Sequence, residues 1–357
     1  WLKVGKGGRR GPRGMSAVAE PKVLPDGAVT CAEHAGAVYC ASWSPRGDKL
    51  ASGSHDNTAK VWDPTTGQCL ATCSGHASYV LSVAWAPDGE RLATGSQDGR
   101  AMIWSASGTC SLECAGHADQ VRIVAWDRNG DHIATGSMDK TMRLWDSVIG
   151  ACTAVCVGHT SYIYCIAWAP GSENLIASGS VDKTARIWDA TSGACLATCS
   201  GHAGPVSSLA WAPSGTRLAT GSHDKRAKVW DAKAGACIAT CVGHGSFLYS
   251  VAWASDVKRL RLATACHDRS VRVWDSVGVC VAVCEGHRGA VYSVAWAPGA
   301  LRLASGSQDR TVKVWDAATG SCVATFVGHV GYIISVTWNP DGNRVASASE
   351  DTQVKVW

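Results

Sequence analysis

The chain has 357 residues, 33 of them basic and 29 acidic, and a formal net charge of +4. Residues 1–14 contribute five basic residues and no acid, so removing that +5 leaves a net charge of −1 for the remainder. A nearly neutral remainder argues against direct binding of nucleic acid. No stretch approaches the roughly 20 apolar residues that span a bilayer, and the start carries no secretory signal pattern.

Residues 1–27 are rich in glycine and basic side chains, and we expect them to form a disordered tail. Met15-Ser16-Ala17 reads like a natural start of translation, so we interpret residues 1–14 as upstream sequence or as a piece of a larger protein. The alternative is a basic arm that binds nucleic acid or anionic lipid.

From residue 28 onward one unit is repeated eight times. Each copy opens with Gly-His or a close variant, and the histidines follow one another at intervals of 41 to 43 residues. Each copy closes with an Asp and, six residues later, a Trp. The histidines are His34, His76, His117, His159, His202, His244, His287 and His329; the aspartates are Asp56, Asp98, Asp139, Asp182, Asp224, Asp268, Asp309 and Asp351; the tryptophans are Trp62, Trp104, Trp145, Trp188, Trp230, Trp274, Trp315 and Trp357. This period predicts radially arranged blades of four strands each.

The fifth unit shows how one copy divides into strands. Residues 205–211 have strand composition and end before the turn Pro213-Ser214-Gly215. Residues 217–222 form a second candidate strand, and residues 226–230 alternate polar and apolar side chains as a third strand would. After a turn that contains Gly235, residues 236–241 make the fourth.

On these residues the chain resembles the WD-repeat β-propeller family over residues 28–357. The resemblance implies an all-β fold, a single eight-bladed propeller of four-stranded antiparallel blades. It also implies that the repeat His, a Ser or Thr four residues before the Asp, the Asp and the Trp hydrogen-bond one another in each blade. The hydroxyl positions here are Ser52, Thr94, Thr135, Ser178, Thr220, Thr264, Ser305 and Ser347. We interpret these residues as structural, because a closed network satisfies buried polar groups.

The two ends of the repeat region predict how the ring closes. The chain ends at Trp357, where the third strand of the last unit ends. Residues 28–31 match the outer strands of other units, such as residues 70–73. We therefore expect the N-terminal segment to complete the last blade and to cover its open edge.

The seventeen cysteines follow the repeat. Fourteen of them lie three or seven residues before a repeat histidine. Within a blade, a Cys-x-x-x-Cys spacing places the two residues about 13 Å apart along a strand, beyond the reach of a disulfide or of one metal ion. We interpret them as small side chains of the outer strand. Unpaired thiols in this number predict a reducing compartment, the cytoplasm or the nucleus.

The sequence offers no basis for catalysis. Eight equivalent Ser/Thr-His-Asp sets argue against one activated nucleophile in one pocket. A phosphate-binding loop, a dinucleotide-binding glycine motif and a zinc-protease helix motif are all missing from the sequence. We therefore expect no enzymatic activity, no cofactor, no metal and no small-molecule substrate.

The tyrosines mark a candidate surface for a partner. All seven tyrosines, and Phe247, lie three or five residues after a repeat histidine, where the family resemblance places the mouth of the channel on the top face. The residue just before the turn Asp is a third such position, and it holds a histidine in three units. The expected partner-binding residues are Tyr39, Tyr79, Arg122, Tyr162, Tyr164, Phe247, Tyr249, Tyr292, Tyr332, His55, His223 and His267.

These residues favour a protein-interaction scaffold that presents its top face to a peptide or loop of another protein within a multiprotein complex. Tyrosines there could hold an Arg or Lys side chain by cation–π contact. The alternatives are a substrate-receptor subunit of a ubiquitin ligase, or a sensor or regulatory domain of a larger protein. Against the receptor, Arg122 is the single arginine at the mouth positions, and the repeats lack the W-D-x-R motif of receptors linked to cullins.

Overall fold

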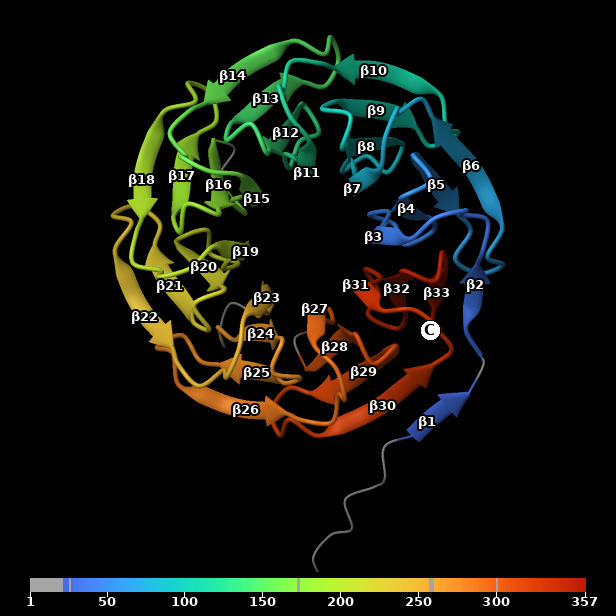
Figure 1. Cartoon of the computed structure of the whole chain (residues 1–357), viewed down its shortest axis with the longest axis vertical. Coiled ribbons are helices and arrows are strands. Elements are labelled where there is room, and N and C mark those ends of the chain that lie inside the picture. Colours follow the sequence, from blue (N-terminus) through green and yellow to red (C-terminus); the bar gives the residue numbers. More distant parts are fainter. Residues whose placement is uncertain (1–21, 26, 172–173, 257–259, 300) are drawn as a thin grey trace, which may run out of the picture.

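The computed structural model describes residues 22–25, 27–171, 174–256, 260–299 and 301–357. They form eight sheets around a central opening (Figure 1). Neighbouring strands within each blade are antiparallel, and the described residues contain strands and turns but no helix. The predicted all-β, eight-bladed propeller is therefore confirmed.

Each of the first four blades is a run of four strands that leads from the channel outward. They are β3 (Val38–Trp43), β4 (Leu50–Ser54), β5 (Thr58–Trp62) and β6 (Cys69–Ser74); β7 (Val80–Trp85), β8 (Arg91–Ser96), β9 (Ala101–Ser105) and β10 (Cys110–Cys114); β11 (Val121–Trp126), β12 (His132–Ser137), β13 (Met142–Asp146) and β14 (Cys152–Cys156); β15 (Ile163–Trp168), β16 (Leu175–Ser180), β17 (Ala185–Asp189) and β18 (Cys195–Cys199).

Blades 5 to 7 repeat this order, and blade 8 takes its outer strand from the N-terminal segment. Their strands are β19 (Val206–Trp211), β20 (Arg217–Ser222), β21 (Ala227–Asp231) and β22 (Cys237–Cys241); β23 (Leu248–Trp253), β24 (Leu262–Cys266), β25 (Val271–Trp274) and β26 (Cys280–Cys284); β27 (Val291–Trp296), β28 (Arg302–Ser307), β29 (Thr311–Asp316) and β30 (Cys322–Val327); β31 (Ile333–Trp338), β32 (Val345–Ser349), β33 (Val354–Val356) and β2 (Val29–Cys31).

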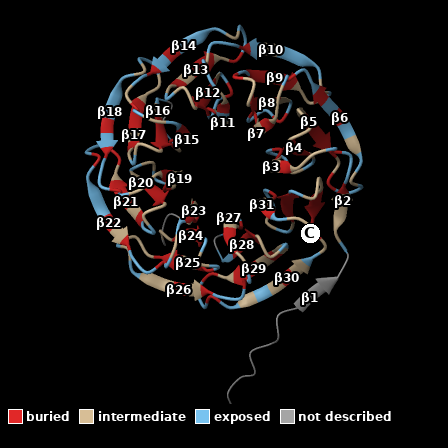
Figure 2. Ribbon diagram, in the orientation of Figure 1, coloured by how far each residue is buried: buried red, intermediate tan, exposed pale blue. Residues whose placement is uncertain are grey.

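Burial falls from the second strand of a blade to its outer strand. In blade 5, β20 is buried along nearly its whole length, whereas β22 begins with two exposed residues and only two of its five residues are buried. Figure 2 shows the outer strands as a largely exposed belt around buried inner strands. A strand that reads as continuous small and apolar residues, such as Leu218-Ala219-Thr220-Gly221, is packed on both faces, because each blade is covered by its two neighbours.

The apolar core lies between blades. One cluster joins Val229 and Ala239 of blade 5 to Leu248, Val251 and Trp253 of blade 6, and similar clusters recur around the ring. The Trp that ends each first strand packs into this core. In seven blades its indole N–H also donates to a backbone carbonyl of the preceding blade, as in Trp211 to Ala167 O at 2.9 Å. The eighth, Trp253, has a buried Nε1 without a hydrogen-bond partner in the described part of the chain.

The ring closes as the sequence predicted. Strand β2 pairs in antiparallel fashion with β33, with Val29 opposite Val356 and Cys31 opposite Val354. The Nζ atom of Lys355 donates to Thr30 Oγ1 at 3.0 Å across this pair. The first and last segments of the repeat region therefore share one blade.

A further strand lies within the segment that the sequence predicted as a disordered tail. Lys22–Pro25 forms β1, which pairs in parallel with β30 at the outer edge of blade 7. Residues 1–21 and 26 of the predicted tail, including the basic residues 1–14, lie outside the described residues. In the described part of the chain, no helix is long and apolar enough to cross a membrane.

The seventeen cysteines are all free. Those three residues before a repeat histidine, such as Cys199 and Cys241, are buried in the outer strand, and burial raises the pKa of each of these thiols to about 12. Those seven residues before it are partly or fully exposed. The buried thiols are therefore protonated packing groups, as the repeat spacing suggested.

Candidate functional site

The three sequence-predicted rim positions meet at one mouth of the channel. In every blade the residue before the turn Asp donates its backbone N–H to the carbonyl of the residue three after the repeat His. The residue three after each repeat His, at the start of the inner strand, therefore lies beside the turn between the second and third strands of the same blade. The pairs are His55–Ala37, Gln97–Tyr79, Met138–Gln120, Val181–Tyr162, His223–Pro205, His267–Phe247, Gln308–Ala290 and Glu350–Tyr332, at 2.8 to 3.0 Å. We call three positions of each blade the rim: the residues three and five after the repeat His, and the residue just before the turn Asp.

Five rim residues of blades 5 to 7 form a continuous aromatic cluster. His223 stacks on Phe247 of the next blade, with ring centroids 5.1 Å apart. Tyr249 lies between His267, at 6.1 Å, and Tyr292 of blade 7, at 5.1 Å. Phe247 keeps 44% of its surface exposed. This aromatic cluster combines apolar area with polar edges, which suits binding of another protein.

The other aromatic rim residues are more dispersed. His55 contacts the ring of Tyr39 in its own blade, at 5.8 Å between centroids, and that of Tyr79 in the next blade. Tyr162 and Tyr332 are 39% and 37% exposed. Neither forms a ring contact within the described residues. The twelve predicted residues therefore do not make one continuous aromatic cluster.

Arg122 faces a cavity at the channel mouth. The cavity has a volume of about 290 Å³ and is lined by Tyr39, Leu81, Arg122, Tyr164 and Ile334, from five adjacent inner strands. The guanidinium of Arg122 lies over the ring of Tyr164, 5.0 Å from its centroid. Burial raises the pKa of Tyr39, and the charge of Arg122 opposes part of that rise. We call this feature the Arg122 cavity.

The four-residue network recurs in all eight blades. In blade 5, Asp224 Oδ2 lies 2.7 Å from His202 Nδ1, and His202 Nε2 lies 2.8 Å from Thr220 Oγ1. The indole N–H of Trp230 donates to the same Oγ1 at 2.8 Å. Because the hydroxyl accepts from the indole, its own proton is free to go to Nε2, which places the ring proton on Nδ1. Equivalent His–Asp and His–hydroxyl contacts span 2.7 to 2.9 Å elsewhere.

The electrostatics of the network fit a neutral imidazole beside an ionised carboxylate. Burial lowers the pKa of His34. Burial alone would raise the pKa of Asp56, but hydrogen bonds from Thr58 and His34 lower it to about 2. The carboxylate also accepts the backbone N–H of Ala35 at 2.9 Å, so it ties the loop between blades to the turn that follows the second strand.

The network residues are poorly placed for nucleophilic catalysis. The side chains of Ser52, Thr94, Ser178 and Thr220 are fully buried. Each hydroxyl is already shared between an indole and an imidazole, as with Ser52, His34 and Trp62. A substrate carbonyl would have to displace that packing to reach the oxygen, so the geometry is that of a structural clamp.

Blade 6 contains a variant of the turn. Cys266 occupies the position of a serine in the other blades, and with His244 and Asp268 it forms the one group of three potential metal ligands found in the described residues. Both ring nitrogens of His244 are already bonded, to Asp268 and to Thr264. The Cys266 Sγ contacts Ser246 O and accepts the N–H of Asp268, as the serine hydroxyls do. Burial raises the pKa of this thiol to about 12, which leaves a protonated sulfur.

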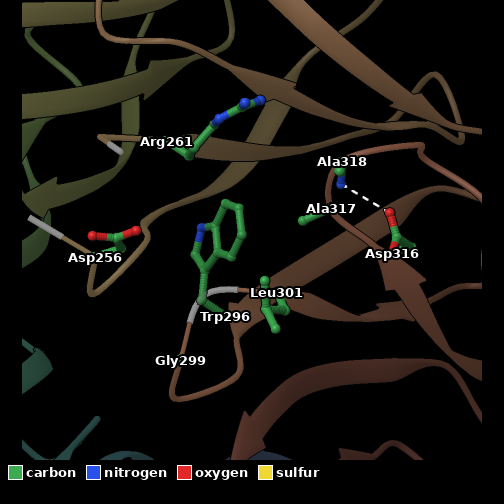
Figure 3. A pocket seen from close by; sticks show the side chains of 8 residues that line it. All are labelled: Asp256, Arg261, Trp296, Gly299, Leu301, Asp316, Ala317 and Ala318. Atoms are coloured by element: carbon green, nitrogen blue, oxygen red, sulfur yellow. Dashed lines mark hydrogen bonds between the residues drawn. The ribbon is translucent and has the colours of Figure 1, made fainter. Parts of the chain in front are cut away.

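The opposite face carries two inter-blade cavities that the sequence analysis missed. One, of about 150 Å³, lies between blades 6 and 7; Figure 3 shows the ring of Trp296 between Asp256 and the Asp316–Ala318 turn. The other, of about 650 Å³, lies between blades 4 and 5 beside Leu175. At the equivalent position in blade 2, Arg91 reaches across to Gly130 O at 2.8 Å. The sequence contained one signal for the cavity between blades 4 and 5: Leu175 is apolar, whereas the equivalent residue in every other repeat is polar or charged.

Comparisons with known proteins agree with this architecture. A sequence model of the WD domain, G-beta repeat, matches residues 28–63, 67–105, 108–146, 150–189, 193–231, 235–275, 278–316 and 320–357. A 41-residue stretch is 46% identical to human WD repeat-containing protein 86, covering 12% of this chain and 11% of that protein. The crystal structure of the computationally designed Ika8 protein is similar, with a TM-score of 0.81 and 27% identity over 91% of this chain and 96% of that one.

Proteins of this family are generally interaction scaffolds and are typically noncatalytic. The match of the family model extends over nearly all of residues 28–357, and the structure contains one blade for each matched repeat. The chain therefore belongs to the WD-repeat family and forms an eight-bladed β-propeller.

Proposed function

We propose that this propeller is a noncatalytic scaffold whose rim binds a peptide or loop of another protein within a multiprotein complex. The aromatic cluster of blades 5 to 7 is the observation that carries the proposal. Its rings contact one another across blade boundaries, so they are held in place before a partner arrives. Rigid aromatic side chains cost little conformational entropy on binding and are frequent in hot spots of protein interfaces.

The histidines extend this surface. His223 and His267 flank Phe247 and Tyr249, and their backbone positions are fixed by hydrogen bonds from the turn to the inner strand. The mouth therefore offers apolar ring faces with hydroxyl and imidazole edges around them. Such a surface matches a peptide that inserts an apolar side chain and pairs its polar groups with the surrounding edges.

The free thiols support a location in a reducing compartment, and we propose the cytoplasm or the nucleus. Ubiquitin-ligase receptors that read phosphorylated peptides need several arginines at the mouth, whereas the rim positions of this chain hold Arg122 alone. The scaffold role is therefore the better match to the rim.

The test is a cross-linked pull-down from native lysate with the full chain and with the triple variant Tyr164→Ala, Tyr249→Ala, Tyr292→Ala. A matched control carries Val148→Ala, Ile149→Ala and Leu301→Ala. These three side chains lie in turns of the opposite face and are 70% to 76% exposed. All three proteins are first compared by thermal melting.

We expect partners to be captured by the wild-type and control proteins and lost from the rim variant while its melting temperature stays unchanged. Retention of the same partners by a folded rim variant would contradict the proposal. It would show that the tyrosines were copied with the repeat and that another surface carries the interaction.

A further inference from the structure

We propose that the Arg122 cavity is an anion subsite that receives the carboxylate of an acidic residue in the bound peptide. The inference deepens the proposed function and rests on it, because it names the chemistry of one anchor in the partner. It starts from the state of Arg122 itself. Within the described part of the chain, Arg122 forms no hydrogen bond or ion pair, although it is a permanent cation.

The cavity offers an anion both polar and apolar partners. Leu81 and Ile334 supply apolar surface, and Tyr39 and Tyr164 supply hydroxyl groups. Arg122 is exposed at the mouth of the cavity, so water partly screens its charge, and an anion must accept hydrogen bonds from the guanidinium as well as make a charge–charge contact. A guanidinium presents a fork of N–H donors that matches both oxygens of a carboxylate. The volume of about 290 Å³ is ample for an Asp or Glu side chain.

The charge pattern of the same face agrees with an acidic partner. Apart from the histidines, Arg122 and Glu350 are the two rim residues whose side chains carry a charge at neutral pH. In blades 3 to 7 the residue after each turn Asp is an exposed Lys or Arg: Lys140, Lys183, Lys225, Arg269 and Arg310. The neighbouring turn carboxylates are hydrogen-bonded by the network histidines and by backbone N–H groups. An arc of exposed cations, none of them in a salt bridge within the described residues, therefore runs along the outside of the rim from the blade of Arg122 to blade 7.

The geometry also favours a carboxylate over the other charged groups that a peptide could place in this cavity. A cationic side chain clasped by Tyr164 would meet Arg122, whose guanidinium already lies over that ring. Phosphate carries nearly two negative charges at neutral pH and is usually held by several basic groups. The residues that line this cavity include one arginine and no lysine. One positive charge in a partly apolar cavity matches the single charge of a carboxylate.

The test is a selection of random heptapeptides, displayed without a free C-terminus, on the full chain and on Arg122→Gln and Arg122→Glu variants. Arg128→Gln is the matched control, since Arg128 is an exposed arginine of the same blade at the opposite face. A Tyr249→Ala, Tyr292→Ala variant reports whether the selected peptides use the aromatic cluster. Thermal melting confirms that each variant is folded.

We expect the wild-type and Arg128→Gln proteins to enrich Asp or Glu at one fixed peptide position. The Arg122→Gln variant should lose that preference, and Arg122→Glu should replace it with Lys or Arg. For the synthesised consensus peptide, changing its acid to the corresponding amide should weaken binding to the wild type about 10- to 100-fold and leave binding to Arg122→Gln almost unchanged.

A further arm uses the same peptide with phosphoserine in place of the acid. Tighter binding of the phosphoserine peptide by tenfold or more, dependent on Arg122, would overturn the carboxylate assignment. Peptides that need Tyr249 and Tyr292 but show no acidic position would refute the subsite and leave the scaffold proposal standing. If no selected peptide depends on Arg122 or on the two tyrosines, the proposed function fails as well.

Discussion

Replacing Thr220 by valine tests whether the network is a major source of stability in each blade. The substitution keeps the shape of a side chain that is fully buried and removes its hydroxyl. That hydroxyl lies 2.8 Å from both His202 Nε2 and Trp230 Nε1, so Thr220→Val leaves two buried ring nitrogens without a partner. At about 1–3 kcal/mol for each unsatisfied group, the free energy of unfolding should fall by about 2–6 kcal/mol.

Thr220→Ser is the matched control, because serine forms the same two contacts in four other blades; in blade 7 Ser305 bonds His287 at 2.8 Å and Trp315 at 2.7 Å. The serine variant keeps both hydrogen bonds and loses one methyl group, a cost of about 1 kcal/mol. Urea denaturation followed by circular dichroism measures both variants. Equal stability of Thr220→Val and Thr220→Ser would refute the argument that the shared hydroxyl holds the blade together.

Four further outcomes are expected. Burial lowers the pKa of six network histidines below the usual 6.5, so the unfolded chain takes up protons before the folded chain does as the pH falls below 6.5. Each histidine then lowers the free energy of unfolding by up to about 1.4 kcal/mol per pH unit. Melting temperatures measured from pH 8 to pH 5 should therefore be constant above pH 6.5 and decline below it. A thiol reagent should label the exposed Cys110, Cys152, Cys195 and Cys237 in the native protein and reach the buried Cys199 and its equivalents after denaturation; labelling of the buried set at the native rate would contradict the assignment. Removing residues 1–31 should uncover the edge of β33, lower the melting temperature and promote self-association visible in size-exclusion chromatography. Tyr249→Ala should weaken binding of a rim partner by about 1–3 kcal/mol in calorimetry, with no change in melting temperature if the residue is a surface anchor.

The fold was predictable because its determinants repeat in the sequence at fixed spacings. Each histidine, hydroxyl, aspartate and tryptophan has one role, and eight copies of the same spacing leave little room for another period. Even the shared blade followed from residues 28–31, which read like an outer strand. Strand β1 was not predictable in this way, since the sequence Lys-Val-Leu-Pro belongs to no repeat and its pairing with β30 depends on where the tail runs.

The sequence placed the rim residues but not their mutual contacts. Spacing alone puts Phe247 near the channel mouth, but its stacking on His223 depends on how far one blade is rotated from the next. The cavity beside Arg122 likewise requires side chains from five inner strands whose separation is set by the width of the ring. The cavity beside Leu175 at the opposite face could not be predicted for the same reason. The sequence shows that this repeat has leucine where others have arginine, but the space exists only between two blades whose separation the sequence does not give.

The residues that stabilise the ring are different from the residues that determine the chemical character of the channel mouth. The network residues bond to one another and to backbone N–H groups, and they are the same in kind in all eight blades. The side chains of Arg122, Phe247 and Tyr292 take no part in that network, so they can differ from blade to blade without leaving a buried polar group unpaired. An eightfold scaffold can thus carry a mouth with an aromatic side in blades 5 to 7 and a cationic cavity in blades 1 to 4 and 8. Because a partner can then approach in one orientation with its apolar and acidic groups both matched, the asymmetry itself supplies specificity.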